Sequence, residues 1–275
     1  MPVGASADQS PEAPAPLEFA LAPYISTRPL LALFQPLATH LQKRLGREVL
    51  LVTAPSLREF DLRALKGGYE FAMLSPQAAR LAQKEAGYVP LLRVADDLFG
   101  VLIVPAASKA TSVRDLAGSK IALPDRFTTT AQLGRELLAS EGFGGDSIVH
   151  PPGFQDSILL SMLRGEIDAM VMNGSAFHQM APETRAKVRV VTETRHISHV
   201  IFLARGDVSA EAQRSMRAAI AEFFDTAPEG ARFSKQSGIT GVRVPTDTEM
   251  KSLDPYAQEH RRLLNEIPGA KSSTP

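Results

Sequence analysis

Short apolar runs alternate with amphipathic segments along this chain, and this alternation constrains the fold more than any other feature. Residues 17–22 form the first apolar run, and within residues 27–46 leucine and phenylalanine recur at three- and four-residue steps. The spacing predicts a strand followed by a helix, and the same order returns up to residue 192. Because strands that alternate with helices form sheets covered on both faces, we expect an α/β protein.

The strand–helix units fall into two series, which predicts two lobes. Two consecutive apolar runs, 89–95 and 99–104, separate the series, and a further run, 199–204, precedes a mostly helical remainder. We expect each lobe to be a mostly parallel sheet flanked by helices, with two crossover strands as a hinge and a cleft between the lobes. The predicted first lobe comprises residues 17–103 and 205–267, and the predicted second lobe comprises residues 104–204.

The C-terminal remainder is expected to complete the first lobe. Its pattern predicts a helix over 210–225, a loop through Gly238 and Gly241, and a last helix over 247–266. Residues 1–16 and 268–275 have a composition typical of a disordered leader and a disordered tail.

Composition excludes several classes of protein. The chain has 30 basic and 30 acidic residues, so no basic surface favours a nucleic-acid partner. It has no cysteine, which excludes disulfides and thiolate sites, and no apolar run approaches the ~20 residues that span a bilayer. The leader carries no signal peptide. Its proline-rich tether resembles the start of an exported protein after signal removal, and an ordinary disordered N-terminus is the alternative.

The motifs of common enzymes are missing, so we expect no catalysis, no metal and no cofactor. The chain lacks a phosphate-binding P-loop, a dinucleotide-binding glycine motif and a nucleophile elbow. His196 and His199 are three residues apart, which in a strand places them on opposite faces and favours a surface or hinge role. Asp96 and Asp97 are adjacent carboxylates that point apart, which is typical of a solvated turn.

Thr128, Thr129 and Thr130 lie between a predicted strand and a predicted helix. Free N–H groups and the positive end of a helix dipole make such a turn a ready anion site. The alternative is that one threonine is a helix N-cap and the others are bystanders. Similar strand-to-helix turns occur at Ser75, with Gln77 in the following helix, and at Asn173.

Apolar side chains near the predicted cleft have two possible roles. They either belong to the core, as expected for strands buried on both faces, or line a pocket of apolar character. The residues concerned include Tyr24, Phe99, Phe127, Phe154, Met162 and Met172.

Several segments, in the same order, resemble the phosphate/phosphite/phosphonate-binding periplasmic proteins of ABC importers. These are LLALFQPLATHLQKRLG at 30–46, LKGGYEFAMLSP at 65–76, AGYVPL at 86–91, VRDLAGSKIA at 113–122 and LRGEIDA at 163–169. The resemblance implies a two-lobed, hinged periplasmic-binding-protein fold of type II that delivers its ligand to a membrane permease or, in some relatives, presents it to a sensor.

At the ligand positions the chain departs from the family pattern that it resembles. Thr128 to Ala131 replace a Ser-Thr-Ser-Gly-type turn, Phe99 replaces a tyrosine, and Gln155 with Asp156 stands where a histidine is usual. The expected ligand-contacting residues are Tyr24, Ser75, Gln77, Phe99, Phe127, Thr128, Thr129, Thr130, Phe154, Gln155, Asp156, Met172 and Asn173.

The function expected from the sequence is capture of a small ligand, with a phosphate- or phosphonate-type oxyanion favoured, by a monomeric periplasmic protein that serves a transporter. One alternative keeps the scaffold and places a lipid- or sterol-like ligand against Phe99, Phe127, Phe154, Met162 and Met172. A second alternative is a ligand-sensing module that docks on a sensor kinase.

Overall fold

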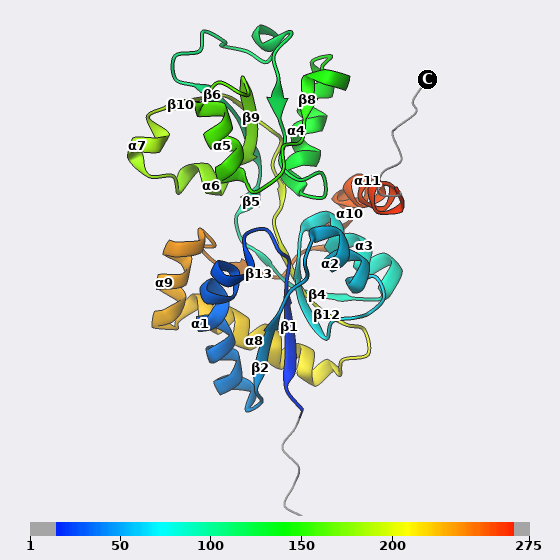
Figure 1. Cartoon of the computed structure of the whole chain (residues 1–275). Helices are drawn as coiled ribbons and strands as arrows, with labels where there is room; N and C mark the ends of the chain where they lie inside the picture. The colour runs from blue at the N-terminus through cyan, green and yellow to red at the C-terminus, as the bar shows by residue number, and fades with distance from the viewer. Residues whose placement is uncertain (1–14, 267–275) are drawn as a thin grey trace, which may run out of the picture.

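The computed structural model describes residues 15–266 and contains two separate sheets stacked end to end, joined by two thin crossovers (Figure 1). The predicted leader and tail lie outside the described residues, apart from the last two positions of the leader. The first sheet has the strand order β13-β4-β12-β3-β1-β2. Its strands are β1 (Leu17–Leu21), β2 (Val49–Val52), β3 (Phe71–Leu74), β4 (Val89–Val94), β12 (Ile201–Ala204) and β13 (Val242–Arg243).

The second sheet has the order β10-β6-β9-β7-β8. Its strands are β6 (Gly100–Pro105), β7 (Ile121–Ala122), β8 (Ile148–Val149), β9 (Ala169–Asn173) and β10 (Val188–Glu193). Most strands of each sheet run in one direction, as expected: β1 to β4 in the first sheet and β7 to β10 in the second. Strands β2, β1 and β3 are parallel, but β12 runs antiparallel to both β3 and β4. Likewise β6 runs antiparallel to both β9 and β10, because β6 and β12 are the strands that arrive from the other lobe.

The crossovers lie a few residues from the predicted positions. We expected residues 99–103 in the first lobe and 201–204 in the second, but β6 belongs to the second sheet and β12 to the first. Between the sheets, β5 (Asp97–Leu98) pairs antiparallel with β11 (Ile197–Ser198). This two-stranded ribbon forms the hinge.

Helices cover both faces of both sheets (Figure 1). They are α1 (Thr27–Leu45), α2 (Leu57–Ala64), α3 (Pro76–Ala86), α4 (Thr129–Ser140), α5 (Gln155–Leu163), α6 (Gly174–His178), α7 (Pro182–Arg185), α8 (Ala210–Asp225), α9 (Pro228–Ser237), α10 (Asp247–Ser252) and α11 (Asp254–Asn265), with 3₁₀ turns η1 (Arg114–Leu116) and η2 (Gly145–Ser147). Helix α9 was expected to be a loop, and the predicted last helix is two helices, with Pro255 opening the second.

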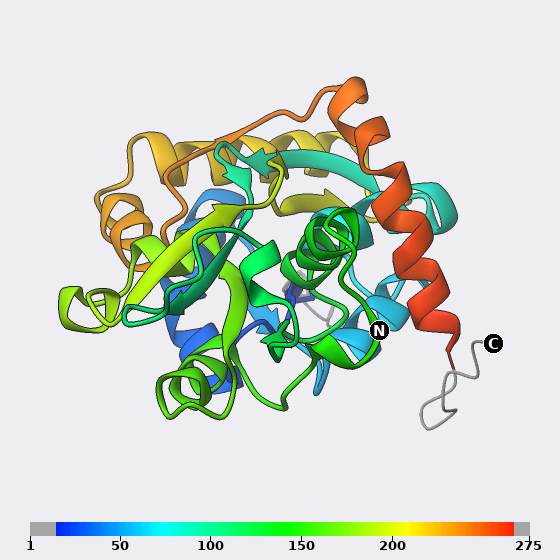
Figure 2. The same cartoon turned by 90° about the horizontal axis from the view of Figure 1, so that it is seen from above.

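The predicted amphipathic helices bury the residues that define their apolar stripe. In α1 the side chains of Leu30, Phe34, Leu37 and Leu41 are 0% exposed and pack with α8 and α9 on one face of the first sheet. Helices α2, α3 and α11 cover the opposite face. Figure 2 shows α11 along one edge of the molecule. None of the helices within residues 15–266 is long and apolar enough to cross a membrane.

Candidate functional site

The carboxyl ends of parallel strands from both lobes face each other across the hinge, where α/β proteins bind their ligands. Ser75 follows β3 in the first lobe, while the Thr128 turn follows β7 and Asn173 ends β9 in the second. The backbone connects the last two, because Gly100 lies opposite Asn173 in the β6–β9 pairing and a Cβ on Gly100 would lie 3.5 Å from Thr130 Cγ2. The turns at Thr128 and Asn173 therefore lie close together in the second lobe.

Thr128, at the first of these turns, is a helix cap. Its hydroxyl donates to the carbonyl of Asp125 at 2.7 Å and accepts from the N–H of Ala131 at 3.1 Å. The hydroxyl thus both donates and accepts within the chain itself. This agrees with the interpretation of one threonine as a helix N-cap. Its side chain offers a ligand no free hydrogen.

Thr129 and Thr130 differ from Thr128 and from each other. The Thr129 hydroxyl donates to Oε1 of Gln77 at 2.6 Å, so its hydrogen is also taken. The Thr130 hydroxyl has no hydrogen-bond partner among the described residues, and neither have the backbone N–H groups of Thr129 and Thr130. The first turn of α4 therefore presents two N–H groups and one hydroxyl that can still donate, next to the positive end of a 12-residue helix.

Gln77 reaches from α3 of the first lobe to this turn. Its Nε2 donates to the carbonyl of Phe127 at 2.9 Å while its Oε1 accepts from Thr129. The side chain is 0% exposed, so we correct the expectation that its amide is open to a ligand. Ser75, two residues earlier, is the N-cap of α3 but makes no side-chain capping bond and is half-buried. Its hydroxyl remains available.

A second pair of amides lies at the end of β9. The backbone N–H of Asn173 donates to Oε1 of Gln155 at 2.6 Å, and Oδ1 of Asn173 accepts from the N–H of Ala176 at 3.1 Å. These bonds fix both side chains through their oxygens, and their NH₂ groups have no partner among the described residues. Phe154, at 44% exposed, and the exposed Asp156 flank Gln155 at the start of α5.

The apolar candidates do not converge on one pocket. Met162 and Met172 are each 1% exposed and belong to the core of the second lobe, so these two candidates are corrected to core residues. Phe127 packs edge-on against His260 of α11, with ring centroids 6.0 Å apart. Phe99, next to β5 of the hinge, stacks on His196 with ring centroids 4.3 Å apart. Tyr24 is 40% exposed on the loop after β1.

Sequence reasoning missed a second interlobe region beside the turn. Gln132, Arg135 and Glu136 of α4 and Tyr256 and Glu259 of α11 line a cavity of about 270 Å³, with Ala139, Arg195 and Pro255. Neither amide atom of the buried Gln132 has a hydrogen-bond partner. Spacings of three and four residues from Thr129 predict that these α4 residues share one face, but not that this face meets the other lobe.

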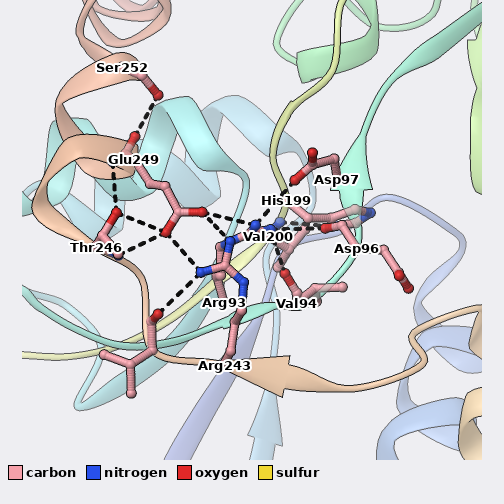
Figure 3. Close-up of polar contacts among 11 residues, drawn as sticks. Arg93, Val94, Asp96, Asp97, His199, Val200, Arg243, Thr246, Glu249 and Ser252 are labelled. Carbon is pink, nitrogen blue, oxygen red and sulfur yellow. Dashed lines mark hydrogen bonds and ion pairs between the residues drawn. The ribbon is translucent and has the colours of Figure 1, made fainter.

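The hinge is braced by a charged network that Figure 3 shows. The buried guanidinium of Arg93 lies 3.2 Å from Asp97 and 3.0 Å from Glu249. Asp97 is thus an ion-pair partner as well as an exposed, solvated carboxylate. The bond from Arg243, together with Thr246 and Arg93, holds the pKa of the Glu249 carboxyl at about 2. Burial lowers the pKa of His199 to about 4.

The donors at the turns are neutral. They are N–H, hydroxyl and amide groups, and no group of three potential metal ligands occurs within residues 15–266. Neutral dipoles aligned on a helix N-terminus suit an oxyanion, since they compensate its charge by hydrogen bonds.

Comparisons with known proteins agree with this architecture. A structure of PhnD1 from Prochlorococcus marinus in complex with methylphosphonate superposes with a TM-score of 0.78 at 14% identity, covering 92% of this chain and 99% of that chain. A binding protein component of an ABC phosphonate transporter from Pseudomonas aeruginosa gives 0.75 at 16%, covering 93% and 90%. A Xanthomonas citri protein bound to ATP gives 0.74 at 17%, covering 90% and 98%. At these identities the likeness shows the two-lobed type II fold.

The family follows from a match that covers most of both lobes. Residues 19–250 match the family model described as ABC transporter, phosphonate, periplasmic substrate-binding protein. This range begins in β1, contains the hinge and every turn described above, and ends in α10. The chain therefore belongs to the phosphonate-type periplasmic substrate-binding proteins of ABC transporters.

Proposed function

We propose that this protein binds a phosphonate-type oxyanion between its lobes, as a monomer in the periplasm, and delivers it to a membrane permease. The observation that carries the proposal is the first turn of α4, where two backbone N–H groups and the Thr130 hydroxyl have no partner among the described residues. The structure of PhnD1 in complex with methylphosphonate supports it at the level of the shared fold.

The donors available around this turn suit a tetrahedral oxyanion. The N–H groups of Thr129 and Thr130 and the hydroxyl of Thr130 would bind from the second lobe, and the hydroxyl of Ser75 from the first. The NH₂ groups of Asn173 and Gln155 add donors at the end of β9. Because the ligand would contact both lobes at once, its binding would favour the closed state.

The remaining expected residues are assigned to the wall of the site. We propose that Tyr24, Phe99, Phe154 and Asp156 border the ligand, with Asp156 exposed at the entrance. Asp156 would repel an oxyanion that approached it closely, which favours a binding position nearer to Thr130.

The two alternative functions gain no support. A lipid- or sterol-like ligand would need an apolar pocket, but Met162 and Met172 lie in the core and Phe127 packs on α11. For a sensor-docking module, no surface feature within residues 15–266 gives specific support.

Titration calorimetry tests the proposal with methylphosphonate, phosphate and methanesulfonate. We expect methylphosphonate to bind most tightly, and Ser75→Ala to weaken its binding about tenfold or more, since a hydrogen bond to a charged group is lost. The matched control is Ser140→Ala at the far end of α4, whose exposed hydroxyl donates to Leu137. Absence of heat with all three anions up to roughly 1 mM would refute the proposal.

A further inference from the structure

Gln77 makes a direct contact between the two lobes. It lies in the first turn of α3 and is 0% exposed, whereas both of its partners, Phe127 and Thr129, precede or begin α4 in the second lobe. The sequence pattern did not predict this contact. A glutamine in a helix that covers the first sheet is ordinarily solvated or bonded within its own lobe.

The carboxamide is matched to the turn that it contacts. Its NH₂ group donates to the Phe127 carbonyl at 2.9 Å, and its oxygen accepts from the Thr129 hydroxyl at 2.6 Å. A carboxylate of the same shape could not donate to the carbonyl, and an apolar side chain would leave both partners buried without a bond. Since Thr129 is 3% exposed, such a loss would not be repaired by water while the lobes stay closed.

The same face of α4 carries further contacts to the first lobe. Two helical turns beyond Thr129, Tyr256 of α11 donates to Glu136 at 2.8 Å, and Arg135 lies 3.4 Å from Glu259. Helix α11 is itself fixed to α3, where Arg80 lies 2.8 Å from Asp254. Gln77 thus stands at the cleft end of a continuous interface between α4 and the pair α3 and α11.

We infer that Gln77 is a positioning residue that closes the lobes in the absence of ligand and holds the first turn of α4 in its binding orientation. The Gln77 bonds form only when the lobes are together, because their partners belong to different sheets, so they add to the stability of the closed state alone. Gln77 engages the Thr129 side chain and leaves the N–H groups of Thr129 and Thr130 without a partner among the described residues. A ligand then binds to a turn that is already ordered, and it selects a closed state that is already populated.

The test measures the distance between the lobes in ligand-free protein. Because the chain has no cysteine, Ala32→Cys in α1 and Arg164→Cys after α5 introduce two exposed labelling sites, one in each lobe. Spin labels at these positions report the closed and open populations by pulsed dipolar spectroscopy. We expect Gln77→Ala to lower the closed-to-open ratio about tenfold, the factor expected for loss of two buried hydrogen bonds.

Two further variants distinguish this role from a general loss of structure. Thr129→Val preserves shape but removes the hydroxyl; it should shift the distances in the same direction, and combining it with Gln77→Ala should add less than the sum of the two effects. Gln83→Ala is the matched control, because Gln83 lies in the same helix and bonds only Arg80 within its own lobe. It should leave the distances unchanged, and the thermal midpoints of the Gln77 and Thr129 variants should stay close to that of the parent.

The inference is overturned if Gln77→Ala and its parent give the same distance distribution without ligand, or if Gln83→Ala shifts it equally. Since no ligand is present, this outcome is separate from the fate of the proposed function. Adding methylphosphonate to the spin-labelled protein connects this test with the proposed function. If that anion is the ligand, it should restore the short distance in Gln77→Ala, and if it is not, the ligand-free result still stands.

Discussion

The guanidinium of Arg93 lies 3.0 Å from the carboxylate of Glu249, and the Arg93 side chain is only 3% exposed. Arg93 belongs to β4, the last strand of the first sheet before the hinge, whereas Glu249 lies in α10, so the pair joins the hinge to the C-terminal segment (Figure 3). The same guanidinium donates to the carbonyl of Asp96 at 3.0 Å and lies 3.2 Å from Asp97. The buried guanidinium of Arg93 therefore holds the backbone in place where the first crossover begins.

Replacing Arg93 should be costly in stability. We expect Arg93→Met to lower the free energy of unfolding by about 3 kcal/mol, because two carboxylates and two carbonyls lose a buried partner. Arg243→Met is the matched control: it removes a second cation from the same Glu249, but Arg243 is 42% exposed and its loss should cost less than about 1 kcal/mol. Urea unfolding followed by circular dichroism measures both, and equal costs would contradict the assigned role of Arg93.

His199 should make stability depend on pH in the mildly acidic range. Burial holds its pKa at about 4 against an ordinary value of 6.5; Asp96 and Asp97 oppose this shift and Arg93 adds to it. Below pH 6.5 the unfolded chain takes up a proton that the folded protein refuses, so stability should fall as the pH drops from about 6.5 to about 4. We expect this contribution to be about 2 kcal/mol. His199→Gln should flatten the curve of unfolding free energy against pH in this window, and an unchanged slope would exclude His199 as its source.

A buried contact between His260 and the Asp61 carboxyl anchors α11 to α2. Nε2 of His260 lies 2.9 Å from Oδ2 of Asp61, and the two side chains are 0% and 3% exposed. Burial raises the pKa of the Asp61 carboxyl, and the bond from His260 opposes this rise. We expect His260→Leu alone to cost about 3 kcal/mol of unfolding free energy, since it leaves a buried acid without its partner. The double variant Asp61→Leu with His260→Leu should recover part of the loss in urea unfolding; a double variant less stable than the single one would show that the pair acts otherwise.

Close packing of α8 against α9 depends on Gly230. A Cβ at this position would overlap the backbone carbonyl of Phe223, which cannot move without shifting α8. Gly230→Ala should therefore cost about 2 kcal/mol, although alanine is the better helix former. Gly144→Ala is the control, because a Cβ at Gly144 meets nothing within 4 Å and its φ of −172° suits any residue. Its effect should stay within about 0.5 kcal/mol, and thermal unfolding of both variants decides the comparison.

Local patterns predicted most of the elements, and long-range packing decided where they failed. Helix α8 (Ala210–Asp225) and helix α3 (Pro76–Ala86) occupy the ranges that their periodicity and capping residues predict. Helix α9 was missed because it carries one large apolar residue, Phe233, whose ring packs 5.1 Å from that of Phe34 in α1. The antiparallel placement of β12 was missed for a similar reason, since it depends on which lobe the returning strand joins.

The site shows the same division between local and distant causes. Local chemistry predicted the strand-to-helix turns at Ser75, Thr128 and Asn173, because hydroxyls and amides favour such positions. It could not predict which hydroxyls stay free. Thr128 caps its own helix, and Thr129 donates to a glutamine of the other lobe. Of the three threonines, Thr130 alone has a hydroxyl without a hydrogen-bond partner among the described residues. That selection depends on how the lobes close.

The contrast between Thr128 and Thr130 gives a final prediction. Thr128→Ala removes the cap of α4 and should lower the thermal stability by about 1 kcal/mol, while methylphosphonate affinity changes little. Thr130→Val preserves the shape but removes a hydroxyl hydrogen that is free to donate, so it should weaken methylphosphonate binding about tenfold or more with little change in stability. Calorimetric titration and thermal unfolding of the two variants separate the effects. If instead Thr128→Ala abolishes binding and Thr130→Val retains it, the capping hydroxyl of Thr128 binds the ligand. The binding site then lies nearer to Asp125.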